Sequence, residues 1–108
     1  MPSGSVVEKV YENALVHLAR KDALKVDQQD PIRVTYDGVI VGEFAADLRV
    51  EESVLVELKA VSDLAPEHLA QALNYLRATG LQVCLLINFG KSRIQVRRLV
   101  PSPNWKSS

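Results

Sequence analysis

The spacing of apolar residues predicts two helices. Over residues 5–21 apolar side chains recur every three or four positions, as on one face of a helix: Val7, Val10, Ala14 and Leu18, with Tyr11 and Leu15 beside them. Ser5 and Glu8 have the spacing of a capping box, which places the start of this helix at Ser5. A second helix is predicted from Pro66 to Gly80, with an apolar stripe of Leu69, Ala72, Leu73 and Leu76.

Elsewhere the period falls to two, which predicts strands. Residues 31–36 alternate apolar and polar side chains and are followed by Asp37-Gly38, a strong hairpin signal. Further strands are expected over residues 44–50, 54–60, 83–89 and 93–97, the third covered on both faces and the last at an edge. The predicted fold class is α/β, with helices packed on a mixed sheet. We expect one domain over residues 1–100 and a C-terminal tail over residues 101–108 that carries Trp105.

Composition narrows the possible functions. The chain has 13 Lys and Arg against 13 Asp and Glu, so no net field attracts a polyanion and nucleic-acid binding needs a local arrangement. No apolar run approaches the roughly 18 residues of a membrane span, which predicts no membrane partner. The single Cys84 excludes an intrachain disulfide and a cysteine-ligated iron–sulfur cluster. Together with the absence of a signal peptide, this suggests a cytoplasmic protein.

Charged residues interrupt two of the apolar strands. In the strand over residues 54–60, Leu55, Glu57 and Lys59 share one face, and Asp47 interrupts the preceding strand. A tight connection would bring two carboxylates and an ammonium together, and burying such carboxylates is costly unless a cation compensates them. Oxygen ligands of this kind suit Mg²⁺ or Mn²⁺. The alternative is a surface strand with an ordinary Glu–Lys pair and an unrelated Asp.

Polar residues on the helices add to this set. Gln71 and Tyr75 are four residues apart on the second helix and share a face with His68, while Glu8 and Tyr11 share a face of the first. The alternatives are a polar shoulder with a Tyr at its edge and, for Glu8, the capping box alone.

In this order and spacing, Asp47, Glu57-Leu58-Lys59 and Gln71 to Tyr75 resemble the D…ExK…QxxxY signature of the PD-(D/E)XK nuclease superfamily, in its RecB-like branch. More closely, residues 8–15, 46–48, 56–61 and 85–90 resemble the small bacterial GxxExxY family, although Ser5 stands where that family has a glycine. The resemblance implies a restriction-endonuclease-like αβββαβ core with a mixed sheet flanked by two helices.

The resemblance also implies roles. Asp47 and Glu57 would bind Mg²⁺ or Mn²⁺ with the Leu58 carbonyl, and Glu8 would be a further ligand, directly or through water. Lys59 would be the catalytic lysine. Three residues would brace the site or touch a nucleic-acid backbone: Gln71, Tyr75 and Tyr11.

Two functions follow as hypotheses, and a weaker third is nucleic-acid binding without hydrolysis. The first is a metal-dependent nuclease that hydrolyses a DNA or RNA backbone, which the lysine beside two acids favours. The second is a non-enzymatic homo-oligomeric assembly protein built on the same fold, suggested by the edge strand and by Trp105 as a candidate oligomer contact. We also expect the small domain to form a homo-oligomer in either case.

Overall fold

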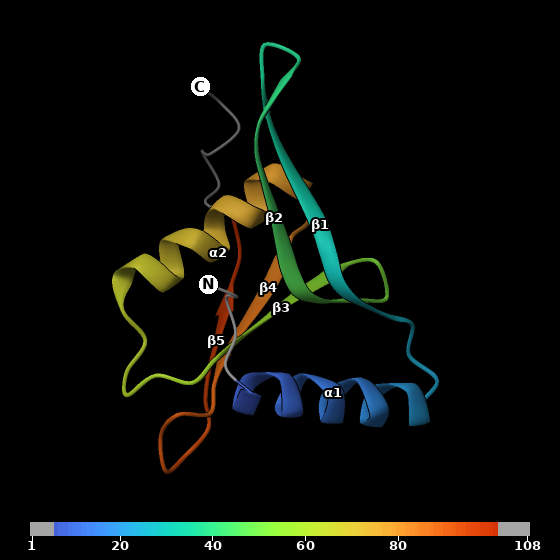
Figure 1. The fold of residues 1–108 in the computed structure, drawn as a ribbon, viewed down its shortest axis with the longest axis vertical. Helices are drawn as coiled ribbons and strands as arrows, with labels where there is room; N and C mark the ends of the chain where they lie inside the picture. The colour runs from blue at the N-terminus through green and yellow to red at the C-terminus, as the bar shows by residue number, and fades with distance from the viewer. Residues whose placement is uncertain (1–5, 102–108) are drawn as a thin grey trace.

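The five strands lie in the sheet in the order in which they occur in the sequence (Figure 1). A computed structural model describes residues 6–101. Neighbouring strands are antiparallel except for β3 (Val54–Lys59) and β4 (Val83–Asn88), which are parallel and are joined through α2 (Pro66–Thr79). The predicted αβββαβ order and mixed sheet are therefore confirmed, and the edge strand expected over residues 93–97 is present over residues 95–99. The elements are α1 (Val6–Lys21), β1 (Val26–Tyr36), β2 (Val39–Val50), β3 (Val54–Lys59), α2 (Pro66–Thr79), β4 (Val83–Asn88) and β5 (Gln95–Leu99).

The two helices cover opposite faces of the sheet. Leu55 of β3 belongs to the core under α2, where it packs with Ala72, Leu76 and Cys84. The next residue, Val56, belongs to the core under α1, with Val16. Successive strand residues point to opposite faces, so β3 is buried on both sides.

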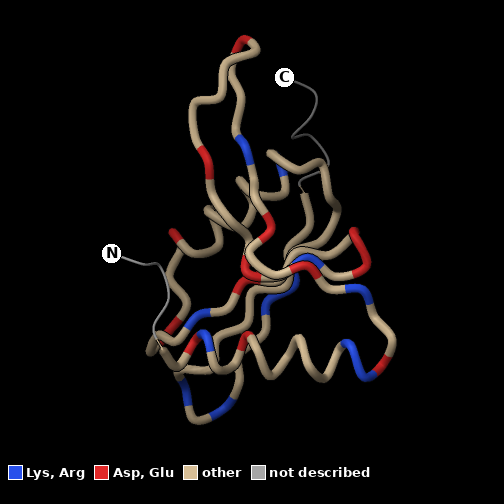
Figure 2. Tube along the Cα trace, turned by 45° about the vertical axis from the view of Figure 1, so that its right-hand side comes forward, with Lys and Arg blue, Asp and Glu red and all other residues tan. Residues whose placement is uncertain are grey.

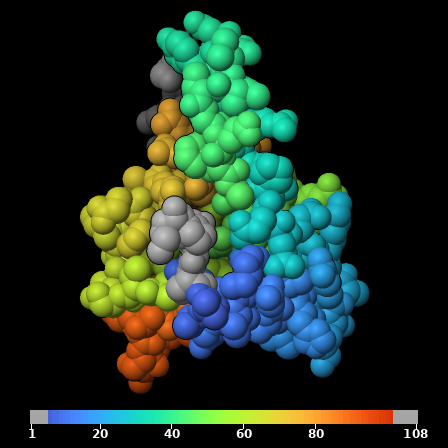
Figure 3. Space-filling view, in the orientation of Figure 1, coloured from blue at the N-terminus to red at the C-terminus, as the bar shows by residue number. Residues whose placement is uncertain are grey.

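A two-stranded arm, formed by the outer parts of β1 and β2, projects from the body (Figures 1 and 3). Its turn has positive φ at both Asp37 (51°) and Gly38 (75°), as a two-residue hairpin turn requires, which confirms the signal read from the sequence. The strand expected over residues 44–50 begins earlier, at Val39. The arm exposes several large apolar side chains, namely Tyr36, Val39, Ile40 and Val41.

The apolar residues whose spacing predicted α1 do not form its buried face. Val7, Val10 and Leu18 are each more than half exposed, whereas Glu12 and Val16 are buried. Glu12 can occupy the buried face because its carboxylate accepts hydrogen bonds from side chains of β1, and apolar periodicity carries no sign of such partners. Ser5, the other half of the predicted capping box, lies outside the described residues.

Helix α2 begins and ends as predicted. Pro66 occupies the first turn, and Gly80 ends the helix in the left-handed conformation with φ of 75°. At the start, the His68 Nδ1 accepts a hydrogen bond from the Ala65 N–H at 2.9 Å. The interpretation of Tyr75 as the edge of a polar shoulder is wrong, because Tyr75 is buried in the core beside Leu76.

The tail over residues 101–108 is described only at Pro101, so Trp105 lies outside the described residues and its role stays a prediction. Within the part of the chain that the structure describes, neither helix is long and apolar enough to span a membrane.

Candidate active site

Strands β2 and β3 separate where the predicted acidic residues lie. Their ladder ends with Leu48 opposite Val56, so Asp47 and Glu57 come just beyond it. There the Asp47 Oδ2 accepts a hydrogen bond from the Leu58 N–H at 2.7 Å. This bond fixes the Asp47 carboxylate in the opening between the two strands.

The Leu58 carbonyl lies on the same side of β3 as this carboxylate. The N–H and C=O groups of one strand residue point toward the same neighbouring strand, and the Leu58 N–H points toward Asp47. The next carbonyl, that of Lys59, points the other way and accepts a hydrogen bond from the Phe89 N–H at 2.9 Å. The chain thus places a backbone oxygen toward the opening that holds Asp47.

Glu57 is a buried carboxyl group with an unsatisfied oxygen. The residue is 7% exposed, and its Oε1 has no hydrogen-bond partner. Burial, followed by the negative charge of Asp47 and a hydrogen bond with it, raises the pKa of Glu57 to about 9, against a lowering by Lys59. At neutral pH Glu57 is therefore protonated beside Asp47.

Lys59 ends β3 on the face that Glu57 occupies. The chain beyond it is held by Asn88, which is fully buried and bonds both the N–H (3.0 Å) and the carbonyl (2.9 Å) of Val61. Gly90 permits this approach, since a Cβ there would lie 2.5 Å from the Val61 backbone nitrogen and oxygen. The sequence indicated Asn88 and Gly90 only through the family resemblance of residues 85–90, which implied no role for either residue.

A second network restrains Asp47 from the α1 side. The Gln29 Nε2 donates to the Glu12 Oε1 at 3.0 Å and to the Asp47 Oδ1 at 3.4 Å. Lys9 offsets the charge of Glu12 through an ion pair at 3.1 Å. Gln29 reaches both acids from a left-handed backbone conformation, with φ of 51°, which few residues other than glycine adopt. No sequence pattern indicated Gln29, and Glu12 appeared only within the resemblance of residues 8–15, with no role implied for it.

Glu8 and Tyr11 attach α1 to the strand ends beside Lys59. The Glu8 Oε2 accepts a hydrogen bond from the Ala60 N–H at 3.1 Å. Tyr11 stacks on Phe89, with ring centroids 4.0 Å apart and planes 13° apart. Within the described part of the chain, no three His, Cys, Asp or Glu side chains lie close enough to hold a metal together, so ligation by Glu8 stays a prediction.

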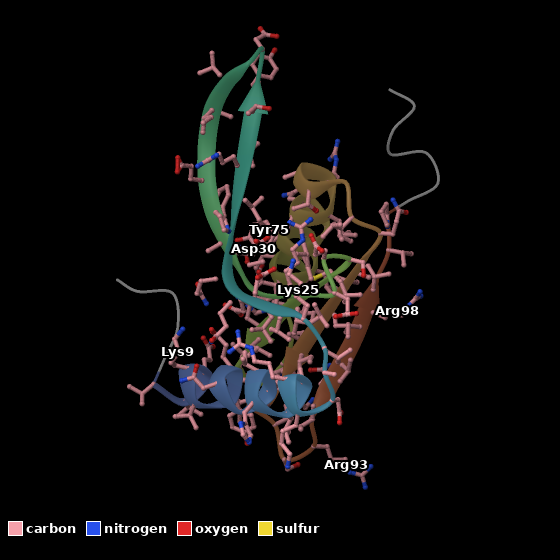
Figure 4. The ribbon with its side chains drawn as sticks, turned by 90° about the vertical axis from the view of Figure 1, so that its right-hand side faces the viewer. Lys9, Lys25, Asp30, Tyr75, Arg93 and Arg98 are labelled. Atoms are coloured by element: carbon pink, nitrogen blue, oxygen red, sulfur yellow. The ribbon has the colours of Figure 1, made fainter. Side chains whose placement is uncertain are left out.

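Tyr75 of α2 interacts electrostatically with the acidic pair, Asp47 and Glu57. Burial, then the charges of Glu57 and Asp47, raise the pKa of Tyr75 to about 12, so its hydroxyl keeps its proton. Figure 4 shows Tyr75 between α2 and the strands. Gln71, one turn earlier, is exposed and lines a cleft of about 750 Å³ that Tyr75 also lines.

Most of the predicted site residues thus gather where β2 and β3 separate, and Figure 2 shows several acidic segments near the middle of the molecule. Two carboxyl groups, one with a buried oxygen that lacks a partner, and a backbone carbonyl on the same side fit a divalent cation that keeps some of its waters. The residues that converge are Asp47, Glu57, Leu58, Lys59 and Tyr75, with Glu8 and Tyr11 at the adjoining strand ends and Gln71 in the cleft.

Comparison with known proteins gives a family and a fold. A sequence model described as the PD-(D/E)XK nuclease superfamily matches residues 3–99. No protein of curated function matches the chain. Two crystal structures share its fold: an alkaline exonuclease (LHK-Exo) from Laribacter hongkongensis, with a TM-score of 0.62 and 16% identity, and SSO0001, with a TM-score of 0.64 and 13% identity.

These alignments cover 87% and 88% of this chain but 56% and 50% of the other two, so the chain spans about half the length of each. At such low identity the likeness concerns the fold alone.

Proposed function

This chain belongs to the PD-(D/E)XK nuclease superfamily, and we propose that it is a metal-dependent nuclease that hydrolyses the backbone of DNA or RNA. Within the superfamily we place it with the small bacterial GxxExxY proteins, on the resemblance of residues 8–15 and 56–61. The proposal rests on one observation above all: one oxygen of the Glu57 carboxyl group is buried without a hydrogen-bond partner. This group lies beside Asp47 and interacts electrostatically with Lys59.

Asp47, Glu57 and the Leu58 carbonyl would hold Mg²⁺ or Mn²⁺. A bound cation of this kind polarises a phosphoryl oxygen and lowers the pKa of a water molecule. Glu57 must release its proton to become a ligand, and its raised pKa makes that release costly at neutral pH. Cation affinity should therefore increase with pH up to about 9.

Lys59 would act on the phosphate. Its ammonium lies on the Glu57 side of β3, where it can stabilise charge that develops on the phosphoryl oxygens. Tyr75, whose hydroxyl stays protonated, would donate a hydrogen bond within the site. Gln29 and the Leu58 N–H would keep Asp47 oriented.

Incubating the purified protein with labelled single- and double-stranded DNA and RNA would test this proposal. Cleavage should require Mg²⁺ or Mn²⁺ and stop with EDTA. Lys59→Ala and Asp47→Asn should each lower the rate by about 10² or more, whereas Lys21→Ala, an exposed lysine at the far end of α1, should not change it. Undiminished cleavage by Lys59→Ala would contradict the assignment.

A second candidate function, homo-oligomeric assembly without hydrolysis, is supported by the apolar side chains that α1 leaves exposed. Val7, Val10 and Leu18 share one face of the helix and are 54%, 60% and 56% exposed. A second copy of the chain could cover this face. Light scattering should then show an oligomer that Val10→Glu dissociates, with no cleavage of any nucleic acid. A monomeric wild type would remove this candidate.

A further inference from the structure

Charge is divided unevenly along the chain. All of its Asp and Glu residues lie at or before Glu67, so no acidic residue accompanies the Lys and Arg residues that follow in the sequence. These basic residues are Arg77, Lys91, Arg93, Arg97, Arg98 and Lys106. The zero net charge of the chain therefore conceals a C-terminal part that is strongly positive, and this part includes β4 and β5.

Three of these arginines, called the arginine edge below, lie on β5 or just before it. They are Arg93, Arg97 and Arg98, and all three are exposed. None of them has a hydrogen-bond or ion-pair partner within the described part of the chain, whereas Lys91 pairs with Asp63 at 2.6 Å. Figure 4 shows Arg93 and Arg98 pointing outward beside β5. Their guanidinium groups are therefore available to an anionic ligand.

The arrangement of the three arginines favours a long ligand that lies along the edge of the sheet. In the described residues no strand lies beyond β5. Arg97 and Arg98 are successive strand residues, so their side chains flank β5 on opposite faces. Arg93 and Arg98 are separated by at most about 17 Å of extended chain. Phosphates recur about every 3.4 Å along one strand of a duplex, so the arginine edge can contact several of them.

Edge protection is the other explanation for charge at this position, because charged side chains prevent two sheets from pairing through their edges. The opposite edge of the sheet provides a comparison. Strand β1 carries Asp27, Asp30 and Arg33, which are charges of both signs. The charges on β5 are all positive. Protection works with charge of either sign, whereas binding of a polyanion requires one sign, so the arginine edge favours binding.

We propose that the arginine edge binds the phosphate backbone of double-stranded nucleic acid. Residues 90–99 contain no aromatic side chain, so the edge offers no ring on which the bases of a single strand could stack. The backbone of a duplex, by contrast, is held mainly through phosphate contacts from Arg and Lys. The inference rests on the proposed nuclease function and adds the form of the substrate.

The arginine edge is close to the acidic pair but separate from it. In the sheet, Glu57 lies opposite Leu86, and Leu86 lies opposite Arg97. Because neighbouring strands are about 4.8 Å apart, the backbones of Glu57 and Arg97 are about 10 Å apart. Substitution of these arginines should therefore weaken substrate binding and raise KM, while kcat at saturating substrate stays unchanged.

Fluorescence anisotropy with a labelled DNA duplex in EDTA measures binding where cleavage is prevented. The wild type is compared with the double variant Arg97→Gln, Arg98→Gln over a series of salt concentrations. Each lost phosphate contact should reduce the slope of log affinity against log salt by about 0.9. The double variant should thus lose about 1.8 of this slope and about tenfold or more in affinity at low salt, and Arg93→Gln alone about 0.9 of the slope.

The matched control is the double variant Lys21→Gln, Arg33→Gln, which removes the same charge from exposed positions elsewhere. It should change affinity less than about twofold. Equal losses in the two double variants would mean that affinity follows net charge alone, and would overturn the proposal. Tighter binding of a single strand than of the duplex, or no binding at low salt, would also overturn it. Arginine variants that self-associate in light scattering but keep their affinity would indicate edge protection instead.

The two proposals fail separately. Duplex binding that depends on the arginine edge without any cleavage would keep this inference and remove the nuclease. Cleavage with a KM that is insensitive to Arg97→Gln, Arg98→Gln would do the reverse.

Discussion

The Asp47 Oδ2 accepts a hydrogen bond from the Leu58 N–H at 2.7 Å, across the point where β2 and β3 separate. Burial, and after it the charge of this same carboxylate, raises the pKa of Glu57. Asp47 therefore accepts a hydrogen bond from the backbone of β3 and also contributes to the raised pKa of Glu57, so a substitution there has two effects that can be measured apart.

Asp47→Ala should destabilise the protein more than Asp47→Asn. Alanine leaves the Leu58 N–H without an acceptor, a loss of about 1–3 kcal/mol in the free energy of unfolding, whereas asparagine keeps an oxygen in place. Urea unfolding in EDTA measures the difference. Both variants remove the charge beside Glu57, so that contribution cancels in the comparison. Equal stability of the two would contradict a structural role for this bond.

Glu57 makes the stability of the metal-free protein fall as pH rises. The pKa of Glu57 is about 9 in the folded protein, against an ordinary value of 4.5. Between these two pH values the folded state therefore holds a proton that the unfolded state has lost. The stabilisation is present below about pH 4.5 and is lost as pH rises toward 9, with a slope of up to about 1.4 kcal/mol per pH unit.

Glu57→Gln should remove most of this slope, because glutamine cannot ionise. Urea unfolding at several pH values in EDTA compares the two proteins, and the variant should be the more stable one on the alkaline side. If the wild type keeps constant stability from about pH 6 to 8, Glu57 is not held protonated.

Cys84 should be unreactive in the native protein. It is fully buried, and burial, then the charges of Glu57 and Asp47, raise the pKa of its thiol to about 12. Since it is the single cysteine, the rate of reaction with a thiol reagent reports opening of the core under α2. We expect reaction only as fast as the protein unfolds, with acceleration in urea. Rapid labelling of the native protein would mean that this core opens locally.

Gly90→Ala should displace the chain that follows Lys59. The added Cβ would meet the Val61 backbone nitrogen and oxygen at 2.5 Å, and no flexible side chain can yield there. The free energy of unfolding should fall by about 1–3 kcal/mol, and cleavage should fall with it. Ser92→Ala, an exposed change in the same loop, is the control and should leave both unchanged.

Local signals in the sequence predicted the elements well. Asp37-Gly38 predicts the turn because both positions must adopt positive φ, and Pro66 and Gly80 mark the ends of α2 for equally local reasons. The two-residue period also placed Glu57 and Lys59 on one face of β3.

Tertiary partners explain what the sequence did not predict. Glu12 is buried on α1 because Gln28 and Gln29 donate to it, and these residues lie 16 and 17 positions away. Val7 and Val10, whose spacing predicted this helix, are exposed instead. Asn88 accepts a hydrogen bond from Val61, which lies 27 residues earlier in the chain. The local spacing of apolar and polar residues carries no sign of such a contact.

Titration calorimetry of Mn²⁺ tests the central claim most directly, that Asp47 and Glu57 form a cation site whose second carboxyl group must lose a proton. Titrations at neutral pH in two buffers of different ionisation enthalpy count the protons released. We predict one ion per chain with release of close to one proton, and for Glu57→Gln at least about tenfold weaker binding without that release. Absence of binding, or equal affinity and proton release in Glu57→Gln, would contradict the claim.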